Sequence, residues 1–190
     1  MVRCPSPSTT YTINGIVDSI ATIVTSADTQ SSEDLPTDWE PLYPGYLGSL
    51  VDGNDLGYEV TDGCTCDTAF SGATMSVNNI QMPETESYLH YTYIGAVAQR
   101  NLVANTHPYH QHVYPYQIVD NQLATGYNAV GDWHDTLKGT GSVRFRPTEF
   151  TGKVMLHCHR LIHEDLGMMA MEKVEASGTC SCTSRQGTRL

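Results

Sequence analysis

The sequence is short of positive charge, because its 190 residues include 10 Lys and Arg against 21 Asp and Glu, a formal net charge of −11. This deficit argues against nucleic-acid binding, which needs a basic surface, and against adsorption to anionic membranes. No apolar run approaches the about 18 residues of a membrane span. The first residues lack the apolar core of a signal peptide, and there is no N-x-S/T site for glycosylation.

Large aromatic residues other than tyrosine are also scarce, with 3 Phe and 2 Trp against 11 Tyr. Together with 16 Gly and 9 Pro, this composition favours short strands and turns over long helices. Charged residues make up only 16% of the chain and hydrophobic residues 39%, so a packed core is expected and wholesale disorder is not.

The chain divides into four predicted segments. Residues 1–25 contain two short β-type runs around Asn14-Gly15, a strong hairpin signal. Residues 26–66 are acidic and rich in Ser, Asp, Gly and Pro, as in a linker. Residues 67–176 form the predicted domain, and 177–190 a tail. Short β-type segments separated by turn signals predict an antiparallel sandwich or barrel in this domain, with a helical turn at 161–168; the segments are 73–82, 87–103, 110–119, 141–147 and 152–159.

Four of the six cysteines form two C-x-C pairs, Cys64 with Cys66 and Cys180 with Cys182, in stretches that look like loop or tail. They are interpreted as disulfide-forming cysteines of an oxidising compartment or as unpaired tail thiols, with copper or zinc binding as the alternative. The sequence leaves the connectivity open, and that of Cys4 as well. Cys158 differs from all of these because histidines flank it on both sides.

Six of the eight histidines occur in two clusters, 107–112 and 157–163. If 155–159 is a strand, Cys158 points to one face while His157 and His159 point to the other. The same parity places His110 and His112 on one face. The histidines therefore divide into two sets, one of His107, Cys158, His163 and Met168, the other of His110, His112, His157 and His159.

The first set suits a blue-copper centre, which has two His and one Cys in a plane with a weak axial Met. Zinc is the nearest rival, but structural zinc sites rarely use Met. The second set offers four imidazoles for copper or zinc. Because His157 and His159 are bonded neighbours of Cys158, electrons would have a short covalent route from the first set to the second.

These motifs resemble the C-terminal cupredoxin domain of the multicopper oxidases, the laccase-like family. The match covers about residues 70–176 and rests on H-P-x-H-x-H at 107–112 and H-C-H-x₃-H-x₃-G-M at 157–168, with support from 132–136 and 144–146. The resemblance implies an all-β, Greek-key cupredoxin sandwich.

The resemblance also implies an activity, the one-electron oxidation of a donor coupled to reduction of dioxygen to water, with His163 as the electron entry and Cys158 as the conduit. Relatives oxidise phenols, amines and metal ions, so the donor stays open. Glu164 and Asp165 are interpreted as solvated carboxylates, Met169 and Met171 as packing residues, and His90 and His134 as ordinary histidines. The implied copper ligands are His107, Cys158 and His163 with axial Met168 for type 1, His110 for type 2, and His112, His157 and His159 for the type 3 pair.

The chain departs from the family pattern, because the trinuclear site of the family needs two further H-x-H motifs and His90 is the only histidine before position 107. Residues 3–25 resemble the closing strands of a preceding cupredoxin domain. We therefore expect a C-terminal part of a longer oxidase, whose parent would be secreted or extracytoplasmic. The alternatives are a mononuclear copper carrier and a homodimer that pools two sets of four imidazoles.

Overall fold

The computed structural model of the chain describes residues 10–14, 19–24, 44–51, 59–82 and 86–182. The chain divides into two compact units, Met1–Leu42 and Tyr43–Leu190. In the first unit β1 (Thr10–Asn14) pairs antiparallel with β2 (Ser19–Val24), as the hairpin signal predicts. The predicted turn, most of the predicted linker and Cys4 lie outside the described residues. Whether this hairpin belongs to a preceding domain stays a prediction.

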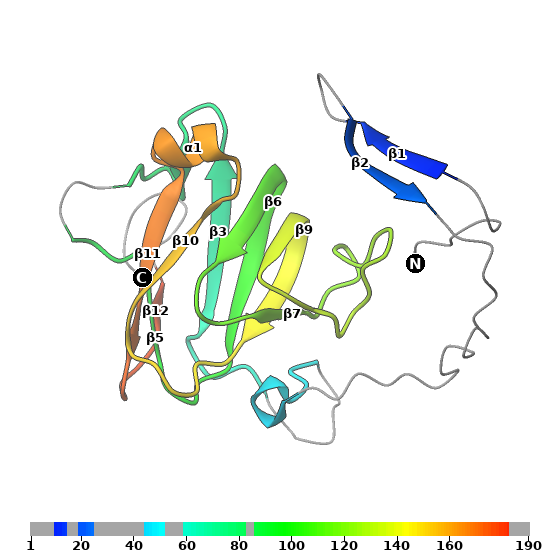
Figure 1. The fold of residues 1–190 in the computed structure, drawn as a ribbon. Helices are drawn as coiled ribbons and strands as arrows, with labels where there is room; N and C mark the ends of the chain where they lie inside the picture. Colours follow the sequence, from blue (N-terminus) through cyan, green and yellow to red (C-terminus); the bar gives the residue numbers. More distant parts are fainter. Residues whose placement is uncertain (1–9, 15–18, 25–43, 52–58, 83–85, 183–190) are drawn as a thin grey trace. The chain divides into compact units, whose positions relative to one another are not determined.

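The regular elements of the second unit are almost all strands (Figure 1). Their order in the main sheet is β12-β5-β11-β10-β6-β9-β7-β8, and β3 joins the edge of β6. Within the described residues, no helix is both long and apolar enough to cross a membrane. The elements are η1 (Gly45–Leu47), β3 (Thr65–Ser71), β4 (Ser76–Val77), β5 (His90–Tyr93), β6 (Ala98–Gln111), β7 (Tyr116–Ile118), β8 (Trp133–His134), β9 (Thr136–Phe145), β10 (Gly152–Cys158), α1 (Leu161–Asp165), β11 (Met169–Glu175) and β12 (Ser181–Cys182).

The sheet is mixed, whereas the strand spacing predicts a wholly antiparallel one. β3 runs parallel to β6, and β5 runs parallel to β11. Parallel neighbours are joined by distant crossovers, which short-range turn signals do not reveal. The prediction of a β-sandwich is confirmed, and the helical turn predicted at 161–168 is present as α1.

Strand β6 connects the two layers of the sandwich. One edge of β6 pairs with β9, while the other edge pairs with β3 along its first half and with β10 at its end. Between the two halves β6 bulges, since it advances from Val103 to Pro108 while β9 moves only from Thr140 to Lys138. Bends of this kind allow a strand to pass from one sheet to the other.

The bulge also changes which side of β6 faces the core. Before it the even-numbered residues are buried, as far as Ala104, and after it the buried residues are His107, Tyr109 and Gln111. The bulge adds three residues to β6 relative to β9, and an odd number of extra residues turns every following side chain to the opposite face. His107 therefore points inward, and His110 and His112 point away from the core.

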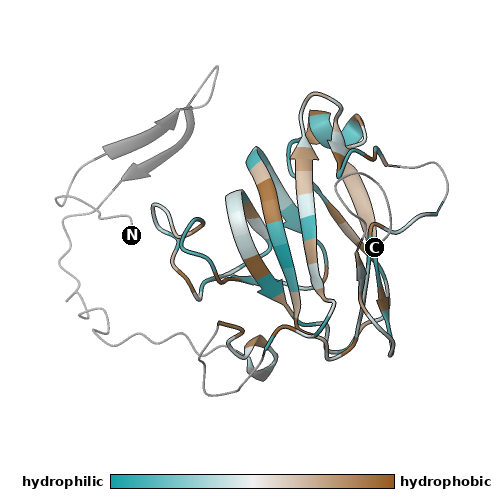
Figure 2. Ribbon diagram, turned by 180° about the vertical axis from the view of Figure 1, so that it is seen from behind, coloured by the Kyte–Doolittle hydropathy of each residue, from teal (hydrophilic) through white to brown (hydrophobic). Residues whose placement is uncertain are grey.

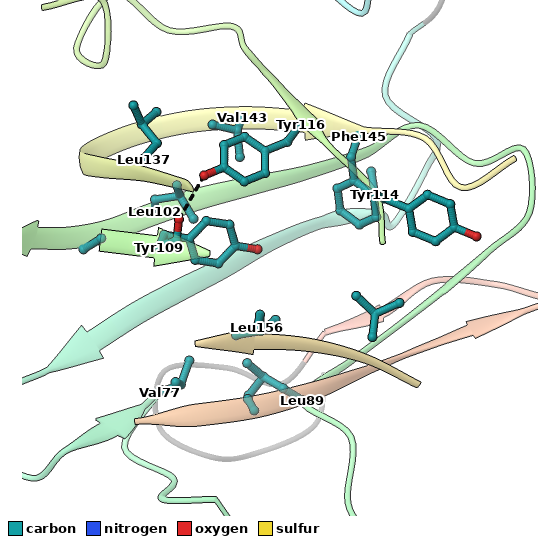
Figure 3. Close-up of a cluster of buried hydrophobic side chains, with 14 of the residues drawn as sticks. Val77, Leu89, Leu102, Tyr109, Tyr114, Tyr116, Leu137, Val143, Phe145 and Leu156 are labelled. Atoms are coloured by element: carbon teal, nitrogen blue, oxygen red, sulfur yellow. Dashed lines mark hydrogen bonds between the residues drawn. The ribbon is translucent and has the colours of Figure 1, made fainter. Parts of the chain in front are cut away.

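The core lies between the two layers. Along the strands, hydrophobic residues alternate with polar ones (Figure 2). Figure 3 shows side chains of β6, β7 and β9 above, among them Tyr109 and Tyr116, facing Leu156 and Leu89 below. Both tyrosines are fully buried with their hydroxyls bonded, Tyr116 to the Tyr109 carbonyl at 3.0 Å and Tyr109 to Gln111 Oε1 at 2.7 Å. Burial raises the pKa of both phenols, so they stay protonated.

The compact unit extends past both predicted ends of the domain. Leu50 is buried, its carbonyl accepts a 2.9 Å bond from Arg144 Nη1, and β3 begins at Thr65, before the predicted start at residue 67. At the other end β12 pairs with β5, inside the predicted tail. Disulfides Cys64–Cys180 and Cys66–Cys182 join these two ends, and each spans 116 residues of sequence.

A buried ion pair crosses the core between β6 and β11. Arg100 Nη2 donates to Glu172 Oε1 at 2.5 Å, and the two side chains are 0% and 1% exposed. The guanidinium also lies over the Phe145 ring, 5.0 Å from its centroid. Such a pair holds two charges in a medium of low polarity, so each partner depends on the other.

Substitution Arg100→Met is expected to lower the free energy of unfolding by about 3 kcal/mol, because the Glu172 carboxylate would remain buried without its cation. Urea denaturation measures the change. The matched control is Lys153→Met, which removes the half-exposed partner of Glu86 at 2.8 Å and should change stability by less than about 1 kcal/mol. Equal, small effects of both substitutions would refute the dependence on burial.

Candidate metal centres

The pairing of β10 with β6 brings the two histidine clusters together. Its register sets Cys158 opposite Tyr109 and His157 opposite His110. Residues opposite each other in a ladder share a face, and consecutive residues alternate between faces. Cys158 therefore shares the inner face of β6 with His107, while His157 lies on the outer face with His110.

The first group consists of His107, Cys158 and His163. The two Nδ1 atoms lie 3.0 Å apart, and Cys158 Sγ lies 3.6 Å from that of His107 and 3.7 Å from that of His163. A point in the plane of these three atoms is about 2.0 Å from each, the length of a metal–nitrogen bond. Two imidazoles and a thiol in a plane are the donor set of a blue-copper centre, so the residues present fit copper.

Burial shifts the pKa of two residues of this first group, His107 and Cys158. It lowers the pKa of His107, aided by the neighbouring charges of His163 and Arg160, so that the imidazole is neutral. It raises the pKa of the Cys158 thiol, which therefore keeps its proton until a metal replaces it. Cys158 is the only free cysteine among the described residues.

The loop after β10 fixes the position of His163 and Met168. Met168 N donates to the His163 carbonyl at 2.9 Å, and Cys158 N donates to the Met168 carbonyl at 3.1 Å. Gly167 between them has φ +100, and a Cβ there would lie 3.3 Å from Gln81 Cβ, so glycine suits this position best. Met168 is fully buried, and its role as axial ligand stays a prediction.

Two residues of this site carry no sequence signal. Phe70 packs edge-on against the His107 ring at 6.3 Å. A Cβ at Gly72 would lie 3.0 Å from His107 Nε2, so a larger residue there would displace the ring. Phe70 lies in β3 and Gly72 comes directly after it. The sequence did not predict this strand, so only knowledge of the fold reveals the two residues.

The second group lies on the other face of β10. Ligand atoms of His110, His112 and His157 lie within 4.8 Å of one another, and Nε2 of His112 is 3.1 Å from Nε2 of His157. His159 joins through its ring, whose centroid is 5.1 Å from that of His110. His112 and His159 are exposed, so this group opens to the surface of the unit.

Hydrogen bonds orient two of these imidazoles. His110 Nδ1 lies 2.8 Å from both the Asp135 carbonyl and Thr136 Oγ1, and His157 Nδ1 lies 3.2 Å from Glu164 Oε2. With the proton on Nδ1, both rings present the Nε2 lone pair, as histidine ligands commonly do. Glu164 is thus more than the solvated carboxylate that the sequence suggests, and its neighbour Asp165 is exposed.

The structure brings seven of the eight predicted ligands into these two groups and places the backbone of Met168 beside the first. Their roles as copper ligands stay predictions. His90 and His134 lie in neither group. His134 belongs to β8, whereas His90 is fully buried beside the disulfides at the far end of β3.

Comparison with known proteins agrees with this arrangement. A family model described as multicopper oxidase matches residues 58–177. Bilirubin oxidase from Albifimbria verrucaria is 27% identical over 113 residues, which cover 53% of this chain and 20% of that protein. The laccase from Pediococcus acidilactici has a TM-score of 0.66 at 22% identity, covering 89% of this chain and 36% of the laccase.

A multicopper oxidase from Pseudomonas thermotolerans has a similar fold, with a TM-score of 0.56 at 19% identity over 90% of this chain and 41% of that one. The chain therefore spans a fifth to two fifths of the length of these relatives. The family model covers well over half of the chain. The chain belongs to the multicopper oxidase family, and its second unit is the C-terminal cupredoxin domain of that family.

Proposed function

We propose that this chain is the C-terminal copper-binding part of an oxidase that couples oxidation of a donor to reduction of dioxygen to water. Copper would supply one-electron transfer at the first group and the multi-electron reduction of dioxygen at the second. The observation that supports this proposal is the position of the two groups on opposite faces of one strand, joined through Cys158 and its neighbours His157 and His159.

The first group would hold type 1 copper through His107, Cys158 and His163, with Met168 as the axial ligand. His107 and Cys158 are buried, whereas His163 is partly exposed at the surface. His163 is flanked in the sequence by three exposed apolar residues of the adjacent helix and loop, Leu161, Ile162 and Leu166. His163 is therefore the edge at which a donor would deliver its electron.

The second group would supply half of a trinuclear site, with His110 for type 2 copper and His112, His157 and His159 for the type 3 pair. Glu164 and the Asp135 carbonyl hold two of these rings in orientation. Because this face is exposed and four imidazoles are too few for three copper ions, the remaining ligands would come from another part of the polypeptide or from another protomer.

Copper titration tests the proposal, followed by visible and EPR spectra and oxygen consumption with a phenolic donor. The chain alone is expected to bind one blue copper and to consume no oxygen. A longer protein that carries two further H-x-H motifs, encoded by a reading frame continuous with this one, is expected to bind four coppers and reduce oxygen. One copper and no oxygen consumption in that longer protein would instead support the alternative, a mononuclear electron carrier.

The mass of the copper-loaded chain tests the remaining alternative, a homodimer that pools two sets of four imidazoles. If the chain alone consumes oxygen as a dimer, two copies pool their imidazoles and the missing ligands come from the second protomer. A monomeric mass excludes that arrangement. Either outcome leaves the assignment of the first group to be decided by the spectrum.

A further inference from the structure

A third group of metal-ligand side chains lies in the strands that join the ends of the unit. The Sγ atoms of Cys66 and Cys182 and a ring nitrogen of His90 all lie within 4.8 Å of one another. They come from β3, β12 and β5. Neither the oxidase activity nor the two histidine groups uses them.

Local structure explains this convergence. The register of β12 with β5 places Cys182 directly opposite His90. Cys66 and Thr68 occupy buried positions on one face of β3, and Thr68 Oγ1 lies 3.3 Å from His90 Nε2. His90 is fully buried, and burial lowers its pKa well below the ordinary value, so the imidazole is neutral, the form in which histidine binds a metal.

The Cys64–Cys180 disulfide would keep these ligands together when the Cys66–Cys182 disulfide is reduced. Cys64–Cys180 joins the same two segments, two residues away on each. The start of β3 and β12 therefore stay side by side even without the Cys66–Cys182 bond. Cys182 is also partly exposed on a short strand at the edge of the sheet, where a reductant can reach it.

We propose that Cys66, Cys182 and His90 form a site for a cuprous ion once the Cys66–Cys182 disulfide is reduced. The two thiolates and the imidazole would be its ligands. A dithiol would supply two electrons and two protons, so that the S–S bond breaks, two thiols form and the dithiol becomes a cyclic disulfide. Binding of Cu⁺ would then release the two thiol protons. Soft thiolates favour monovalent copper over hard cations.

This site is separate from the type 1 site. Cys66 stands near the start of β3, while Gly72, against which His107 packs, follows its other end. Six residues of strand correspond to about 20 Å. The proposal therefore does not depend on the proposed oxidase function.

The test uses the full chain with Cys158→Ser, which removes the thiol of the type 1 site. One half is reduced with a phosphine, freed of it without air, and both halves are offered Cu⁺ as its bicinchoninate complex. The two histidine groups are the same in both halves, so they contribute equally. The reduced protein is expected to take up one more Cu⁺ per chain, with sulfur and imidazole neighbours in the difference between the X-ray absorption spectra of the two halves.

Two variants on the same background sharpen the test. Cys66→Ala/Cys182→Ala removes the two proposed thiolates but leaves Cys64 and Cys180 in place, so it should lose the additional Cu⁺. His90→Gln should weaken its binding by at least about tenfold. Equal uptake with and without reduction, retention of the additional ion in the double variant, or absence of an imidazole signal from the difference spectrum of the His90-containing protein would each overturn the proposal. The last measurement holds even if His90→Gln fails to fold.

Discussion

Replacing Cys158 by serine is expected to abolish the intense blue colour of the copper-loaded chain. That colour requires a copper–thiolate bond, which a serine hydroxyl cannot replace. Within the described residues no other free cysteine is available, since Cys64, Cys66, Cys180 and Cys182 form disulfides. Cys158 Sγ is also one of the three donors of the first group, 3.6 Å from Nδ1 of His107 and 3.7 Å from Nδ1 of His163.

Visible and EPR spectra of both proteins at equal copper loading measure this effect. The substitution leaves His110, His112 and His157 in place, so copper bound there should persist as a weakly coloured signal. The matched control is Cys66→Ala/Cys182→Ala, which also removes sulfur but should keep the blue band. Retention of the band in Cys158→Ser would refute the assignment of the type 1 site.

Removing both disulfides is expected to destabilise the chain by far more than the sum of the single removals. Each disulfide closes a loop of 116 residues, worth about 5 kcal/mol by chain entropy. Once one is formed, however, the other closes only the small ring made by residues 64–66 and 180–182, worth about 2 kcal/mol. Each single removal should therefore lower the free energy of unfolding by about 2 kcal/mol, and both together by about 7 kcal/mol.

Urea denaturation of the copper-free protein tests this, with Cys64→Ala/Cys180→Ala, Cys66→Ala/Cys182→Ala and the fourfold variant. A domain of ordinary stability retains only 5–15 kcal/mol in total, so the fourfold variant should be close to unfolded at about 25 °C. Additive losses would mean that the two bridges constrain the unfolded chain independently, contrary to their adjacent positions in the sequence.

The candidate sites were predictable because they depend on short-range periodicity. Residues 152–158 form a regular strand, so alternation alone separates Cys158 from His157. The hairpin strands around Asn14-Gly15 and the helical turn after Cys158 follow from similarly local signals. The family motifs then gave each histidine an expected role.

What the sequence could not reveal depends on distant contacts. Strand β3 reads Thr-Cys-Asp-Thr-Ala-Phe-Ser, in which the apolar alternation is weak because Thr68, the middle of its three buried positions, is polar. The disulfide pairing requires β12 to return beside β3. Glu164 acquires its contact with His157 only when α1 folds back over β10.

The bulge in β6 makes the number of residues at this bend as important as their identity. Asn105 and Thr106 are exposed, and Asn105 has φ +50, a left-handed conformation that Asn adopts more readily than branched residues do. Deleting one of these two residues would shift the register of the rest of β6 by one residue. His107 would then point out of the core, and His110 and His112 would point into it. The length of this bend is therefore constrained by the side chains that have to face the two candidate metal centres several residues away.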